Sequence, residues 1–70
     1  MSELSYVRLA NEIAVQFHHL PAAEAEEAIA THLRMFWDPR MRTQLLAHVA
    51  AGGADLDPLV IKASHQIRAA

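Results

Sequence analysis

With 70 residues, a formal net charge of −2 and no cysteine, the chain is expected to form a single domain over residues 1–70, without disulfides or thiolate metal ligands. The lack of cysteine indicates a reducing, cytoplasmic setting, and no run approaches the roughly 18 apolar residues of a membrane span. The acidic net charge also argues against nucleic-acid binding, because phosphate contacts supply most of that affinity.

Alanine dominates the apolar composition. Hydrophobic residues make up 53% of the chain, but 14 residues are alanine, which favours helix and fills little volume. The chain has only two glycines and few runs of β-branched residues, so a sheet is not expected. We therefore expect an all-α domain with a small core that depends on a partner for stability.

The first helix is expected over residues 4–19. Apolar residues recur there at intervals of three and four, which places them on one face of a helix. Ser2 or Ser5 is a suitable N-cap, and Pro21 disfavours helical geometry in the residue before it, so the helix should end near His19. The expected apolar face consists of Tyr6, Leu9, Ala10, Ile13, Ala14, Phe17 and Leu20.

The second helix is expected in the segment of residues 21–37, before the break at Asp38-Pro39. Three glutamates lie in its opening turns and Arg34 lies near its end, which matches the sign of the helix dipole at both ends. Its alanine-rich first half should let a neighbouring backbone approach closely. The expected apolar face consists of Ala22, Ala25, Ala28, Ile29, His32, Leu33 and Phe36.

Two Asp-Pro pairs mark the starts of a third and a fourth helix, because Asp is a favoured N-cap and Pro a favoured first helical residue. The third helix should run from Asp38-Pro39 to about Ala51, where Gly52-Gly53 ends it through left-handed backbone geometry. The fourth should follow Asp57-Pro58. Together these signals predict a compact array of about four short helices, in which the last two contribute Met41, Leu45, His48 or Val49, Leu59, Val60, Ala63 and Ile67 to the core.

No residue pattern indicates a catalytic, cofactor-binding or metal site. The five histidines include no pair at the i, i+4 spacing that lets two imidazoles converge on one ion. Glutamates at the start of a helix are typical of a solvated surface, and the chain has no nucleophile elbow or glycine-rich oxyanion loop. The sequence thus predicts a chain without catalytic activity that binds no metal or cofactor itself.

The candidate functional segment is the stretch LRMFWDPRMR, residues 33–42, which holds the only Trp of the chain and three of its arginines. On a structural interpretation, Asp38 caps the next helix, Pro39 starts it, the arginines are solvated, and Phe36, Trp37 and Met41 close the core at the corner. On a functional one, Trp37 anchors an interface among cations, since Trp and Arg are enriched in binding hot spots. We predict that Trp37, Arg40 and Arg42 face outward in a partner-binding corner made of Arg34, Phe36, Trp37, Asp38, Pro39, Arg40, Met41 and Arg42.

Three segments resemble one known family: VRLANEIAVQF near the start, IATHLRMFWDPRMRTQLLAHV in the middle, and DPLV after the glycines. They are similar to the delta subunit of bacterial NAD-dependent formate dehydrogenases, and the resemblance runs from about Tyr6 to Ile67. Its most specific part is FWDPRMR, Phe36 to Arg42. The Ala10-Asn11 pair, Ile13 and the helix around Leu59 give weaker support.

The resemblance implies a small, non-catalytic accessory subunit that supports assembly, stability or cofactor loading of the enzyme. Its expected partners are the other formate dehydrogenase subunits, with the large alpha subunit as the expected contact. The molybdenum or tungsten bis-pterin cofactor, the iron-sulfur clusters and the FMN would be carried by those other subunits.

Two alternatives stay open beside a permanent subunit. One is a maturation chaperone that binds the alpha subunit only transiently. The other is a small helix-turn-helix DNA-binding protein, since two helices meet at a short turn and the second begins with arginines. An apolar face made for a partner would also allow the isolated chain to associate with itself.

Overall fold

The computed structural model describes the backbone of residues 2–69 and the side chains of residues 6–68. Four helices make up nearly all of this part: α1 (Ser2–Gln16), α2 (Ala22–Phe36), α3 (Pro39–Ala50) and α4 (Pro58–Ala69). The all-α prediction is confirmed. Within the described backbone, no helix combines the length and the apolar character needed to cross a bilayer.

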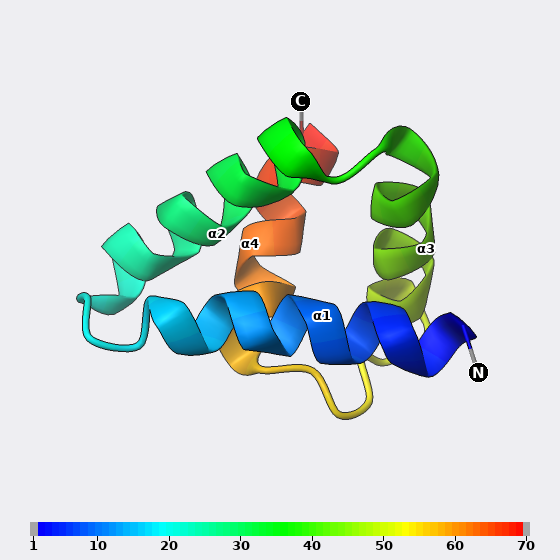
Figure 1. Cartoon of the computed structure of the whole chain (residues 1–70), viewed down its shortest axis with the longest axis horizontal. Coiled ribbons are helices and arrows are strands. Elements are labelled where there is room, and N and C mark those ends of the chain that lie inside the picture. Colours follow the sequence, from blue (N-terminus) through cyan, green and yellow to red (C-terminus); the bar gives the residue numbers. More distant parts are fainter. Residues whose placement is uncertain (1, 70) are drawn as a thin grey trace.

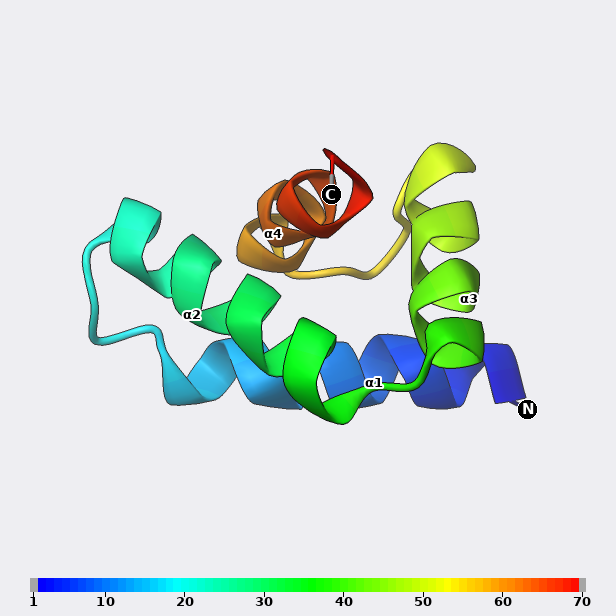
Figure 2. The ribbon, with the colours of Figure 1, turned by 90° about the horizontal axis from the view of Figure 1, so that it is seen from above.

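The helices form a compact array with a Cα radius of gyration of 10.7 Å, as predicted, and not a parallel bundle. Figure 1 shows α1 along the base, with α2 and α3 splayed above it, and Figure 2 shows α4 between these two. The most extensive helix contact joins α2 to α4, whereas α2 and α3 touch each other least although they follow one another in the chain. The angle between α2 and α3 therefore depends on the residues of their joint.

Proline and glycine set most helix boundaries as expected, but α1 ends at Gln16 rather than near His19. Before Pro21 the chain forms turns with hydrogen bonds between residues three positions apart. These bonds run from Phe17 N–H to Ala14 O (3.0 Å) and from Leu20 N–H to Phe17 O (3.1 Å). The predicted N-cap at Ser5 is wrong, because Ser5 lies inside α1. The side chain of Ser2, the other candidate, lies outside the described residues.

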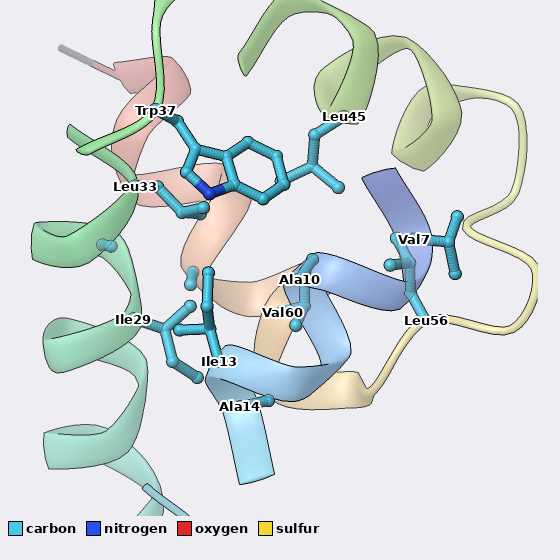
Figure 3. Packing of buried hydrophobic residues seen from close by; sticks show 12 residues of the cluster. Val7, Ala10, Ile13, Ala14, Ile29, Leu33, Trp37, Leu45, Leu56 and Val60 are labelled. Atoms are coloured by element: carbon cyan, nitrogen blue, oxygen red, sulfur yellow. The ribbon is translucent and has the colours of Figure 1, made fainter. Parts of the chain in front are cut away.

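The core is small and combines a few large side chains with many alanines. Its largest fully buried apolar residues are Ile29, Leu33, Leu45 and Val60, each at 0% exposure, and Figure 3 shows them in one cluster. Alanines from three helices are equally buried, which lets the backbones approach closely. On α1, Val7 is buried whereas Leu9, which periodicity placed on the apolar face, is 41% exposed.

The connection between α3 and α4 follows the predicted glycine stop. Gly52 and Gly53 have φ angles of 123° and 65°. The Gly52 N–H donates to Val49 O (3.0 Å) and the Gly53 N–H to His48 O (2.9 Å), which satisfies carbonyls at the end of α3. Gly53 is also buried close to Ile61, where an added Cβ would lie 3.1 Å from the Ile61 Cδ1 atom.

Asn11 ties α1 to the start of α4. Its Nδ2 donates to Asp55 O (2.8 Å), and its Oδ1 accepts a hydrogen bond from the Asp57 N–H (2.8 Å). The Asp57 carboxylate accepts from the Leu59 N–H (2.9 Å) and lies 2.7 Å from His18 Nε2, so the predicted cap at Asp57 is confirmed. One amide on α1 therefore fixes the loop that positions α4.

We predict that Asn11→Ala lowers the free energy of unfolding by about 1–3 kcal/mol, because it leaves the partly buried Asp57 N–H without its acceptor. Urea denaturation followed by circular dichroism would measure the loss. Gln16→Ala, an exposed position on the same helix, is the matched control and should change stability by less than about 0.5 kcal/mol. Equal stability of the two variants would contradict the role of Asn11.

Candidate functional site

The candidate corner is the joint between α2 and α3, residues 33–42. Helix α2 ends at Phe36, and Trp37 adopts extended geometry (φ −90°, ψ 139°) while its N–H donates to Leu33 O at 3.2 Å. Asp38 then accepts a hydrogen bond from the Met41 N–H (2.9 Å), and Pro39 is the first residue of α3. The helix break and the Asp-Pro start are thus confirmed.

Trp37 points into the protein. Its side chain is only 7% exposed, and Figure 3 shows the indole between Leu33 of α2 and Leu45 of α3. Its ring also packs against Tyr6 of α1, with centroids 6.4 Å apart. The interpretation that places Trp37 in the core is therefore confirmed and the outward-facing one is wrong, because the indole packs in the space between α2 and α3.

Phe36 takes the opposite position, exposed at 69%. Its ring lies on the outer side of α2 against His32, with centroids 4.8 Å apart. The expectation that Phe36 packs inward is also wrong. Helix α2 diverges from α1 towards its C-terminal end (Figure 1), so the face that buries Ile29 is no longer covered at Phe36.

Arg42 closes the corner from the side of α3. Its Nη1 donates to Leu33 O (3.2 Å), to Arg34 O (3.3 Å) and to Trp37 O. Carbonyls in the last turn of a helix lack partners within the helix, so a guanidinium placed there satisfies them and complements the negative end of the helix dipole. The half-buried Arg42 is therefore turned inward, contrary to the prediction that it faces outward.

Of the two other arginines of the corner, Arg34 is hydrogen-bonded to another helix, whereas Arg40 is not. Arg34 donates from Nη2 to Gln66 O (3.2 Å), which joins the end of α2 to the last turns of α4. Arg40 is exposed and makes no hydrogen bond or ion pair within the described residues. Of the eight corner residues, Phe36, Pro39 and Arg40 therefore have exposed side chains that make no hydrogen bond or ion pair among the described residues. The binding role of the corner stays a prediction.

An open groove of about 490 Å³ begins at Phe36 and follows the outer side of α2. We call it the α2 groove. Its larger apolar walls are Phe17 and Leu20 from the α1–α2 connection and Met35 and Phe36 from α2. Met35, which the sequence reading left out, is 70% exposed. The sequence signal for its exposure is its position outside the core-facing residues of α2, next to Phe36.

The histidines take separate structural positions. His18 lies beside Asp57, and His48 Nε2 lies 2.7 Å from Ala54 O. Among residues 6–68, no group of three or more His, Asp or Glu side chains is placed to hold a metal ion. With no cysteine in the sequence, the donor set does not fit an iron-sulfur cluster, which thiolates hold.

A second hollow of about 230 Å³ lies between α1 and α3, lined by Tyr6, Gln44 and His48 among others. It is smaller than the roughly 300–1,000 Å³ of usual small-molecule sites. The polar side chains along it include no nucleophile beside a base. We therefore assign no binding function to this hollow.

These features define a small helical protein. Its corner is stabilised by the buried Trp37 and by the hydrogen bonds of Arg42, and the outer face of α2 exposes large apolar side chains. This combination is typical of interaction proteins. The chain belongs to the family of NADH-dependent formate dehydrogenase delta subunits, FdsD, whose model matches residues 6–64. The resemblance seen in the sequence is thereby confirmed. Comparisons with curated proteins and with solved structures gave no significant match.

We predict that Trp37→Ala lowers the free energy of unfolding by about 3–5 kcal/mol, because it empties the centre of the corner. A domain of this size has only about 4–10 kcal/mol of stability, so much of the protein should unfold. Phe36→Ala, an aromatic truncation one position away, should cost less than about 1 kcal/mol. Thermal melts of both variants test this contrast, and equal melting temperatures would contradict the burial of Trp37.

We predict that Arg42→Ala costs about 1–3 kcal/mol of stability, because the carbonyls of Arg34 and Trp37 lose the guanidinium donor and Leu33 O keeps only the Trp37 N–H. Arg40→Ala removes the same charge from the same helix and should change stability by less than about 0.5 kcal/mol. Denaturant titrations at low and high salt separate the two effects. If both variants lose stability at low salt and neither does at high salt, the effect comes from net charge and not from the hydrogen bonds of Arg42.

Proposed function

We propose that this chain is a non-catalytic accessory subunit that binds other formate dehydrogenase subunits and supports assembly, stability or cofactor loading of the large catalytic subunit. The observation that carries the proposal is the family match over residues 6–64. In this proposal the alpha subunit is the contact, and the redox cofactors belong to other subunits in the cytoplasm.

The chemistry of the chain supports a binding role. The corner arginines Arg34 and Arg42 donate hydrogen bonds to helix carbonyls, and they line no substrate-sized cavity among the described residues. The α2 groove, in contrast, presents Met35 and Phe36 to solvent at 70% and 69% exposure. Exposed apolar side chains gathered along one groove are typical of protein–protein contacts.

The arrangement of the arginines disfavours the DNA-binding alternative. A helix-turn-helix protein needs cations at the start of its second helix to contact phosphates and bases. Here the guanidinium of Arg42 is turned onto the end of α2, which leaves Arg40 as the exposed arginine of that turn. The net charge of −2 adds to this argument.

We expect a tagged copy of the chain, purified from its own cells, to recover formate dehydrogenase subunits. Deletion of its gene should lower formate-dependent NAD reduction in the extract, and a plasmid copy should restore it. Immunoblots of the eluate and an activity assay measure the two effects. Recovery of no subunit, together with unchanged activity after deletion, would contradict the proposal.

The same experiment distinguishes a permanent subunit from a maturation chaperone. A permanent subunit elutes with the cofactor-loaded enzyme in size-exclusion chromatography. A chaperone elutes only with the enzyme that lacks its cofactor. The profiles of both enzyme forms therefore decide between the two roles.

A further inference from the structure

The α2 groove has apolar side chains that the fold itself does not use. Trp37 closes the core at the end of α2, so neither Met35 nor Phe36 is needed to cover it. Phe36 and His32 instead pack on each other on the outer side of the helix. Large side chains that remain exposed after the core is complete are the expected anchors of an interface.

The charges of the groove are of one sign. Glu24 and Glu27 line its other end, and no Lys or Arg lies along it. The nearby Glu26 is turned away and lies 4.0 Å from Lys62 of α4, whereas neither groove glutamate makes an ion pair among the described side chains. A partner with apolar residues alone would leave both carboxylates facing an uncharged surface. A partner with Lys or Arg would complement them.

We propose that the α2 groove binds an amphipathic helix of another formate dehydrogenase subunit, with an apolar stripe and with Lys or Arg at one end. This inference rests on the proposed function and names its contact surface. Glu24 and Met35 are eleven positions apart on α2, which corresponds to about 16 Å along the helix. A partner helix of about three turns spans this length, with its apolar stripe on Met35 and Phe36 and its basic end on the glutamates.

A second copy of the chain fits the groove less well. In a symmetric pair the same surface faces itself, so each copy would bring Glu24 and Glu27 into one interface. The groove contributes no Lys or Arg to balance these carboxylates. Charge complementarity therefore favours a basic helix from another subunit.

The apolar part is tested with Met35→Asp and Phe36→Asp in the full chain, with Val15→Asp as the matched control. Val15 is 62% exposed on α1 and does not line the groove, so it tests the effect of an added charge elsewhere. We expect each groove variant to reduce the recovery of formate dehydrogenase subunits at least about tenfold, and the control to reduce it less than about twofold. Thermal melts confirm that all three variants remain folded.

The charged part is tested with the double substitution Glu24→Lys and Glu27→Lys. Recovery of the other subunits should fall about as far as with Phe36→Asp, and added salt should weaken the wild-type complex. Unchanged or increased recovery with the double variant would overturn the basic-helix partner. Loss of binding in Val15→Asp but not in the groove variants would overturn the groove itself.

The outcome for the wild-type chain keeps the two proposals separate. If the wild type recovers the other subunits and the groove variants do so equally, the groove inference fails and the accessory function stands. If the wild type recovers none, the accessory function fails and the groove inference fails with it. A wild-type dimer in sedimentation that Phe36→Asp converts to a monomer would assign the groove to a second copy, against the proposal.

Discussion

The indole of Trp37 and the guanidinium of Arg42 act on the same joint from its two sides. Helices α2 and α3 make little direct contact, so their packing does not set the angle between them. The side chain of Trp37 occupies the space between the two helices and packs against Leu33 and Leu45. Arg42 donates hydrogen bonds to carbonyls at the end of α2. Because α4 lies between the two helices, its place in the core depends on this angle as well.

The small core follows from the same geometry. Alanines on α1, α2 and α4 let the helices approach closely, and a few large residues fill the remaining space. Once Trp37 occupies the corner, the outer side of α2 has no helix to cover it. The exposed Met35 and Phe36 are thus a consequence of this helix arrangement, and both line the α2 groove.

The features that could be predicted from the sequence are those that a local rule decides. The two Asp-Pro pairs and the Gly52-Gly53 pair act through φ angles and cap hydrogen bonds, which involve only nearby residues. The predicted end of α1 near His19 was wrong, because the residues before Pro21 can form either a further helical turn or the tighter turns that are observed. The bridge made by Asn11 joins residues more than forty positions apart and has no local signal.

The roles of Phe36 and Trp37 show the limit of the candidate-site prediction. Helical periodicity places Phe36 on the same face as Ile29, but burial requires another helix at that height, and α2 has by then diverged from α1. Trp37 lies just beyond the helix in extended geometry, so no helical period governs its direction. The sequence by itself determined the family, the four helices, the caps at Asp38 and Asp57 and the glycine stop after α3, since these depend on local residue chemistry. Only the tertiary structure decided which aromatic side chain lies in the core and which is exposed to solvent, because burial depends on what packs against each side chain.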